Sequence, residues 1–583
     1  MAAPITRFLK SPAAEEACEY LTGVLGKSPL LLKELDLSED KLGDLEWEKL
    51  SALLMDSHSK LEKIMLNNCD LTEKSCSVLA TVLSSKTILK EMNLNNSRLL
   101  DSGVKEICEG LKNPVCELKI LNLYRCRITD EQCLILTSAL KSNPSHLREL
   151  NLSRNKLGDS GVKNLSDLLM NTQFKLEKLD LYRCRITEEQ CLILTSALKS
   201  NPSHLRELNL SLNQIKNTGV NHLCDVLKDS HCKLERLRLS DCSITEEGYK
   251  ALASALRSNP SHLIELDLTG NDPGQSGVKK LNDLLQDGLC SLKIIRFLKS
   301  PAAEEACEYL TGVLGKSPLL LKELDLSGDK LGDLDGEKLS ALLMDSHSKL
   351  EKIMLNNCEL TEKSCSVLAT VLSSKTILKE MNLNNSRLLD SGVKEICEGL
   401  KNPVCELKIL KLSDCSITEE GYKALASALR SNPSHLIELD LTGNDPGQSG
   451  VKELNDLLQD PNCQLKTLRF LKSPAAEEAC EYLTGVLGKS PLLLKELDLS
   501  GDKLGDLDGE KLSALLMDSH SKLEKIMLNN CELTEKSCSV LATVLSSKTI
   551  LKEMNLNNSR LLDSGVKEIC EGLKNPVCEL KML

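Results

Sequence analysis

Aromatic side chains are scarce in this chain of 583 residues, making up 2% of it with one Trp, four Phe and seven Tyr. A globular core of several hundred residues usually relies on aromatic side chains, because each of them buries a large area. Leucine recurs throughout the chain instead. The composition therefore favours one repeated unit with one packing solution over the three or four separate domains that the length alone would predict.

Long apolar stretches are also missing. No uninterrupted apolar run reaches the roughly 18 residues that a membrane span needs, and the N-terminal segment MAAPITRFLKSPAAEEACEY has no run of signal-peptide length. The 25 Cys form no CxxC pair. We therefore expect reduced thiols, a cytoplasmic location and no association with a membrane.

Positive charge is in deficit, because 73 Lys and Arg stand against 85 Asp and Glu, for a formal net charge of -12. Affinity for a phosphate backbone comes from Lys and Arg. The balance predicts no nucleic-acid partner and is compatible with a basic protein partner.

Catalytic and nucleotide-binding motifs are absent as well. A GKS triplet recurs at residues 26–28, 315–317 and 488–490. A Walker A loop needs G-x4-G-K-[ST] between a strand and a helix, whereas here the earlier glycine lies only three positions before the second and the triplet is expected to end a helix. We expect a helix C-cap here, no enzymatic activity and no cofactor.

Cysteines recur at one turn position, often with a second Cys seven residues later. A metal site needs at least three converging ligands, so we expect no metal and interpret each turn Cys as a small side chain that fits beneath stacked turns. Sensitivity of the thiols to oxidation is an alternative hypothesis. The turn cysteines are Cys69, Cys126, Cys184, Cys242, Cys358, Cys415 and Cys531.

What the sequence does contain is a repeat. The phrase LxxLxLxx(N/C)x(L/I) opens at Leu32 and recurs in steps of 28 or 29 residues up to a truncated copy at Leu580. Longer duplications overlie it, because residues 239–410 recur almost unchanged as residues 412–583. Copying whole units preserves a solenoid, since each repeat contacts only its neighbours.

One repeat contains a strand and a helix. The segment LRELNLS at residues 147–153 alternates apolar and polar side chains, as a half-buried strand does. Thr129 and Gln132 have the spacing of a capping box, and Asn143 followed by proline is expected to end the helix. One face of this helix is predicted to be apolar, with Cys133, Leu136, Ala139 and Leu140.

Each strand would be joined to the next by a helix, so successive strands run parallel. The helical layer is thicker than the strand spacing of about 4.8 Å, so the stack bends. We predict an α/β solenoid shaped as a horseshoe, with a parallel sheet on the concave face, helices on the convex face and about 20 repeats of 28–29 residues. A single continuous domain over residues 1–583 is expected.

The turns alternate between Cys (LYRCRI, LSDCSI) and Asn (LSRNKL, LSLNQI). This pattern resembles the ribonuclease-inhibitor class of leucine-rich repeat, and LxELxLSxNxLGDSGVxxL resembles the C-terminal repeats of NACHT-LRR innate-immune receptors, including the expanded fish sets. The resemblance implies a protein-binding scaffold, the ligand-sensing or regulatory region of such a receptor without its NACHT domain. The alternative is a free-standing inhibitor that blocks a basic ribonuclease. Both chain ends fall inside a repeat, so we expect a fragment of a longer receptor or an incomplete gene model.

Protein partners are expected on the concave face. The position before the inner leucine pair carries Glu at every second repeat, with Lys, Arg or Ile between, which predicts a self-compatible, solvated surface. One stretch, between Ile120 and Arg238, has side chains typical of binding hot spots. The candidate partner-binding residues are Tyr124, Arg125, Tyr182, Arg183, Arg236 and Arg238. Ordinary variation among repeats is the alternative interpretation.

Trp47 is the only tryptophan, and its sibling positions hold Gly336 and Gly509. A residue outside the common packing scheme is expected to lie on the exposed outer surface.

Overall fold

A computed structural model describes residues 5–7, 33–38, 44–296, 322–327, 336–469, 495–498 and 513–580, with gaps of one to four residues inside these ranges. The chain divides into two compact units, Met1–Phe297 and Leu298–Leu583. One continuous domain over the whole chain stays a prediction. The three GKS triplets lie outside the described residues.

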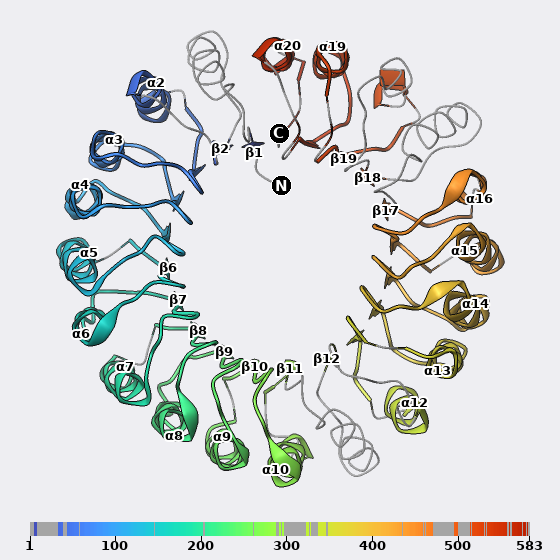
Figure 1. The fold of residues 1–583 in the computed structure, drawn as a ribbon, viewed down its shortest axis with the longest axis horizontal. Helices are drawn as coiled ribbons and strands as arrows, with labels where there is room; N and C mark the ends of the chain where they lie inside the picture. Colours follow the sequence, from blue (N-terminus) through green and yellow to red (C-terminus); the bar gives the residue numbers. More distant parts are fainter. Residues whose placement is uncertain are drawn as a thin grey trace. The chain divides into compact units, whose positions relative to one another are not determined.

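The first unit alternates short strands with helices (Figure 1). Its strands are β1 (Ile5–Arg7), β2 (Glu34–Asp36), β3 (Lys63–Met65), β4 (Glu91–Asn93), β5 (Ile120–Asn122), β6 (Glu149–Asn151), β7 (Lys178–Asp180), β8 (Glu207–Asn209), β9 (Arg236–Arg238), β10 (Glu265–Asp267) and β11 (Ile294–Arg296). Its helices are α2 (Asp44–Met55), α3 (Glu73–Leu83), α4 (Asp101–Lys112), α5 (Asp130–Ser142), α6 (Gly158–Leu169), α7 (Glu188–Ser200), α8 (Lys216–Leu227), α9 (Glu246–Ser258) and α10 (Gly274–Gln286).

The second unit is built in the same way. Its strands are β12 (Glu323–Asp325), β13 (Lys352–Met354), β14 (Glu380–Asn382), β15 (Ile409–Lys411), β16 (Glu438–Asp440), β17 (Thr467–Arg469), β18 (Glu496–Asp498), β19 (Lys525–Met527) and β20 (Glu553–Asn555). Its helices are α12 (Gly336–Met344), α13 (Glu362–Leu372), α14 (Leu389–Leu400), α15 (Glu419–Ser431), α16 (Gly447–Leu458), α19 (Glu535–Leu545) and α20 (Asp563–Leu573).

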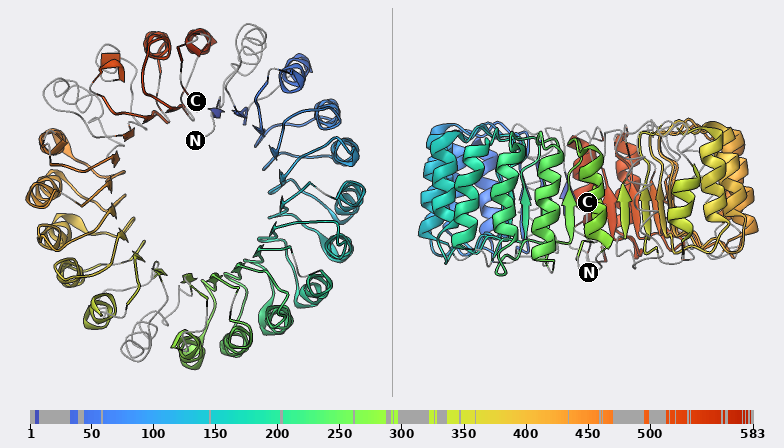
Figure 2. Two further views of the ribbon diagram at one scale, coloured as in Figure 1. Left: turned by 180° about the vertical axis from the view of Figure 1, so that it is seen from behind. Right: turned by 90° about the horizontal axis from the view of Figure 1, so that it is seen from below.

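Within each unit, consecutive strands pair in parallel. Residues at equivalent positions of neighbouring repeats lie opposite each other in the sheet. On β6 and β7, for example, Glu149 pairs with Lys178 and Leu150 with Leu179. The strands form one layer, and in each unit the helices stand on its convex side with their axes alongside the strands (Figure 2). The predicted α/β leucine-rich-repeat solenoid is thereby confirmed. Among the described residues, no helix has the length and apolar character needed to cross a membrane.

The core lies between the two layers and consists of the residues that the repeat places there. Leu150 and Leu152 are buried beneath the sheet. Helix α5 begins with the predicted capping box, in which the Gln132 amide donates to the Thr129 hydroxyl and the Thr129 amide donates to the Gln132 side chain. It ends at the predicted residue, with Asn143 as its C-cap. The predicted apolar face, Cys133, Leu136, Ala139 and Leu140, is buried.

A buried turn side chain ties each repeat to the one before it. Asn155 donates from Nδ2 to the Leu123 carbonyl at 2.8 Å, and its Oδ1 accepts from the Ile128 amide at 2.9 Å. Both partners belong to the preceding repeat. The amide thus satisfies a carbonyl at the end of a strand and an amide in the turn, which would otherwise be buried without partners.

A cysteine at this turn position makes only the donated hydrogen bond, to the carbonyl of the preceding repeat. Cys184 Sγ donates to the Leu152 carbonyl at 3.1 Å, and Cys126 Sγ to the Leu94 carbonyl at 2.9 Å. The structural interpretation of the turn cysteines is confirmed. Serine also serves, because Ser97 Oγ donates to the Leu66 carbonyl at 2.8 Å and accepts from the Cys69 amide at 3.1 Å. The sequence pattern, written as Asn or Cys, missed this third residue type.

The expectation that Trp47 is exposed is wrong, because its side chain is 1% exposed. It lies on α2 one turn before the buried Leu50, on the same helical face. The indole therefore packs on the core side of α2, and departure from the repeat consensus did not indicate exposure.

Substituting Asn155 tests the turn ladder. We expect Asn155→Ala to lower the free energy of unfolding by about 3 kcal/mol, because the Leu123 carbonyl and the Ile128 amide both lose a buried partner. Asn155→Cys keeps the donor and should lose about half as much. The measurements are urea unfolding and hydrogen exchange at the Ile128 amide. Lys163→Ala, on the exposed face of α6, is the control, and equal losses for Ala and Cys would contradict the assignment.

Candidate functional site

The charged column on the strands is paired with itself. Lys178 Nζ lies 3.6 Å from Glu149 and 3.7 Å from Glu207, and Lys63 lies 3.5 Å from Glu34 and 3.2 Å from Glu91. The second unit repeats the arrangement at Lys352 and Lys525. The predicted self-compatible surface is confirmed.

Two of the candidate residues, Arg236 and Arg238, belong to this paired surface. Both lie on β9. Arg236 pairs with Glu207 and with Glu265 (3.5 Å), and Arg238 lies 3.5 Å from Glu265. The structure does not bring them together with the candidate tyrosines, which lie in the turns after β5 and β7.

The other four candidates gather around a residue that the sequence did not single out. Tyr124 and Tyr182 follow β5 and β7, and the turn after β6 places Arg154 between them. The Arg154 guanidinium carbon lies 5.5 Å from the Tyr124 ring centroid and 5.7 Å from that of Tyr182, at cation–π distance. Hydrogen bonding to the Tyr182 side chain raises the pKa of Arg154. We call these three residues the Tyr-Arg sandwich.

The arginines of these turns have an unusual backbone. Arg125, Arg154 and Arg183 have φ of 55°, 57° and 54°. In other repeats of the first unit the same position holds Asn68, Asn96, Asp241 and Gly270, which suit left-handed backbone, and Leu212, which does not. The arginines are therefore present despite a local conformational preference against them.

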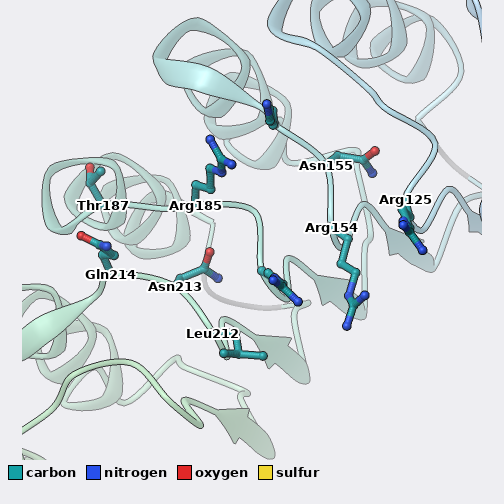
Figure 3. A pocket seen from close by; sticks show the side chains of 10 residues that line it. Arg125, Arg154, Asn155, Arg185, Thr187, Leu212, Asn213 and Gln214 are labelled. Carbon is teal, nitrogen blue, oxygen red and sulfur yellow. The ribbon is translucent and has the colours of Figure 1, made fainter.

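A hollow of about 830 Å³ opens beside the sandwich, across the turns after β5 to β8 (Figure 3). We call it the basic hollow. It is lined by Arg125, Arg154, Asn155, Lys156, Arg183, Arg185, Thr187, Leu212, Asn213 and Gln214. Five of these carry positive charge and none carries negative charge. The amides of Asn155 and Asn213 are engaged in the turn ladder, so the arginines and Lys156 supply the free donors.

The positive charge extends over two turn positions in four consecutive repeats, which we call the basic rim. Its residues are Arg98, Arg125, Arg127, Arg154, Lys156, Arg183 and Arg185. Within the described part of the chain, none of them forms an ion pair with a carboxylate. In the sequence of the second unit, the second of these positions holds Lys330, Arg387, Lys503 and Arg560, whereas Asp414, Ser416 and Asp445 stand at other turns. Comparing turn positions between duplicated repeats was the sequence signal for Arg154, Lys156 and Arg185.

The described cysteines are free, and all but Cys578 are buried. Burial raises the pKa of the Cys126, Cys184, Cys242 and Cys415 thiols to about 12, because desolvation disfavours the thiolate. The native thiols are thus held in their unreactive form. Among the residues that the structure describes, no group of three or more His, Cys, Asp or Glu has the arrangement of a metal site.

Comparison with known proteins places the chain in a family. The model described as "Leucine Rich repeat" matches residues 143–166, 201–224, 230–253 and 405–426. Ribonuclease inhibitor of Mus musculus is 36% identical over 313 residues, covering 54% of this chain and 68% of the inhibitor. This chain belongs to the ribonuclease-inhibitor family of leucine-rich-repeat proteins. The Sus scrofa ribonuclease inhibitor, another member, is 36% identical over 291 residues, which are 50% of this chain and 63% of that protein.

Larger proteins contain the same type of repeat. "NACHT, LRR and PYD domains-containing protein 12" of Mus musculus is 36% identical over 313 residues, 54% of this chain but only 29% of that protein. The predicted resemblance to both groups is confirmed. The chain spans less than a third of this relative, so the relative's activity as a whole protein is not transferred by the match.

The buried thiols predict a loss of stability at alkaline pH. An unfolded thiol titrates near pH 8.5, and the native thiols titrate near 12. Below pH 8.5 both states keep the proton, and stability does not depend on these groups. Above it the unfolded chain releases protons that the native chain retains, so stability falls by about 1.4 kcal/mol per pH unit for each thiol. Urea midpoints between pH 7 and 10 measure the slope.

Replacing Cys126 and Cys184 by Asn provides the matched variant. Asn suits the turn ladder and does not titrate, so the double variant should lose less stability than the parent chain over the same pH range. An unchanged slope would show that other groups cause the alkaline loss.

Proposed function

We propose that this chain is a protein-binding scaffold, and that it contacts its partner through the Tyr-Arg sandwich and the adjoining concave strand face. In this proposal it acts in the cytoplasm as the ligand-sensing or regulatory repeat region of a NACHT-LRR type receptor, with no enzymatic activity and no nucleic-acid or membrane partner. The Tyr-Arg sandwich is the observation that carries the proposal.

Three properties of the sandwich support a contact role. Tyr and Arg are the residue types in which interface energy concentrates. Mutual stacking holds Tyr124, Arg154 and Tyr182 in place before binding, which reduces the entropy lost on association. Arg125 and Arg183 flank the sandwich and are exposed. Arg236 and Arg238 are left out of the proposed contact, because glutamates already pair with them.

The alternative is inhibition of a basic ribonuclease, which the match over 68% of the mouse inhibitor favours. The strand-face glutamates that would attract a basic enzyme are paired with Lys or Arg of this chain. The basic rim would repel such an enzyme. The electrostatics therefore favour an acidic partner, and a direct inhibition assay with a basic pancreatic-type ribonuclease separates the two functions.

Photo-crosslinking tests the proposed contact. Benzoylphenylalanine in place of Tyr182 in the full-length chain should capture a protein in cells, whereas the same group at Ser413, which holds the position of Tyr124 in the second unit, should not capture that protein. With the captured protein purified, Tyr124→Ala or Tyr182→Ala should weaken binding about 30-fold, as truncation of an interface hot spot does.

Arg387→Ala is the matched control, because it removes an exposed arginine at the turn position of Arg98 in the second unit. Its affinity should equal that of the parent chain. Equal capture from the Tyr182 and Ser413 positions, or full affinity of both tyrosine variants, would contradict the proposed contact. Stoichiometric inhibition of the ribonuclease would replace it with the alternative function.

A further inference from the structure

The basic hollow concentrates positive charge that the chain does not neutralise. Arg125, Arg154, Lys156, Arg183 and Arg185 line a volume of about 830 Å³ in a protein whose formal net charge is -12. No carboxylate lines it, and none of the five cations has an ion-pair partner among the described residues. Cations held this close repel one another, and the repulsion opposes folding unless something offsets it.

Nearby carboxylates in the sequence are committed elsewhere. Glu188 directly follows Thr187 of the hollow, but it pairs with Lys216 at 2.9 Å, and this hydrogen bond lowers the pKa of Glu188. Asp180 accepts from the Tyr182 amide at 3.0 Å and also from the Ser153 hydroxyl. Neither of these two carboxylates therefore supplies the missing negative charge.

The backbone supplies an independent argument. The left-handed position of the turn is filled by Arg in three consecutive repeats and by Leu212 in the next, although Asn, Asp and Gly fill it in others. Residues kept in a disfavoured conformation cluster where function requires them. In addition, Arg154 Nε is buried and has no hydrogen-bond partner in the described part of the chain. The first unit thus keeps both a conformational and an electrostatic disadvantage at one place.

We propose that the basic hollow binds a compact polyphosphate anion, the oligophosphate group of a small molecule. Arginine forks donate two parallel hydrogen bonds to a phosphate. Each phosphate monoester carries about 1.5 to 2 negative charges at neutral pH, against one for a carboxylate. Two or three linked phosphates therefore match five cations in a hollow whose volume lies in the ordinary range for small-molecule sites. Lys156 adds a point charge, and Thr187 and Gln214 add neutral polar groups.

An acidic peptide and a nucleic acid fit this site less well. A peptide brings one charge per residue and must bury backbone groups, for which the hollow offers few acceptors. A single strand of nucleic acid is bound by a long positive groove with stacking aromatics. Here the two tyrosines flanking the hollow already stack on Arg154. The inference does not depend on the proposed protein contact, because it concerns a ligand of a different kind.

Calorimetric titration of the full chain with sodium tripolyphosphate, at about 0.15 M salt so that weak surface attraction is screened, tests the inference. We expect one ligand per chain. Arg154→Gln and Arg183→Gln should each weaken binding about tenfold, as loss of a charged hydrogen-bond donor does. Arg387→Gln removes an arginine at the same type of turn in the second unit and should leave the affinity unchanged.

Lys156→Gln and Arg185→Gln alter exposed side chains and serve as further variants if either of the first two fails to fold. Adenosine triphosphate and inositol hexakisphosphate, titrated in parallel, distinguish a linear phosphate chain from phosphates arranged around a ring, and tighter binding of either than of tripolyphosphate supports the site. A glutamate oligomer and single-stranded RNA of matched charge should bind at least about tenfold more weakly.

Three results would overturn the inference. The first is no heat of binding with any of the phosphate probes. The second is a loss of tripolyphosphate affinity with Arg387→Gln equal to that with Arg154→Gln or Arg183→Gln, which would show a general charge effect. The third is tighter binding of the glutamate oligomer or RNA, which would assign the basic rim to a macromolecule. The first two results leave protein capture at the Tyr182 position unaffected, and the third would favour an acidic macromolecular partner, so failure of this inference is distinguishable from failure of the proposed function.

Discussion

The structure depends on one repeated contact, the hydrogen bond from a buried turn side chain to the backbone of the preceding repeat. A strand of three residues ends quickly, and the carbonyl of the residue that follows it accepts a hydrogen bond from the next turn. Asn155 reaches the Leu123 carbonyl from this turn position, while Cys184 and Ser97 make the corresponding bonds in other repeats. A buried carbonyl without a partner is unfavourable by about 1–3 kcal/mol. In the repeats that the structure describes, the turn residue is therefore short, polar and buried.

This constraint determines what the turn displays to solvent. The residue just before the buried one has left-handed backbone and is exposed in several repeats, as Arg125 is before Cys126 and Arg183 before Cys184. Because each turn is tied to its predecessor, these outward residues stack in a row from repeat to repeat. When several consecutive repeats carry the same residue type at this outward position, their side chains therefore form a line along the turns. The backbone of the turns stays the same while the residue at this position varies.

Much of this was predictable from sequence because the fold depends on local patterns. The period of 28–29 residues gave the parallel strands, the capping box of Thr129 gave the start of α5, and the alternation of Glu and Lys gave the paired strand face. The site was only half predictable. The tyrosines were found by their rarity, but Arg154 stands in a common turn phrase, and only the three-dimensional stacking places it between Tyr124 and Tyr182. The prediction for Trp47 was wrong for the opposite reason. The rarity of the residue was interpreted as exposure, whereas the side chain is buried in the core.

The strand face and the basic rim follow the same stacking rule with opposite results. Stacking brings the same repeat position into contact with itself, so a column is neutral only if its charge alternates between neighbours. On the strands it does, and each Lys or Arg meets a Glu on either side. On the rim it does not, because four consecutive repeats carry the same sign. The strand column, with alternating charge, and the basic rim, with uniform charge, lie on the same repeats. Acidic residues at the rim positions would have neutralised the rim as they do the strand column. Since only the strand column is neutralised from within, the balancing charge for the rim is most simply supplied by a bound molecule, and stacking between Tyr124 and Tyr182 keeps Arg154 ordered until it arrives.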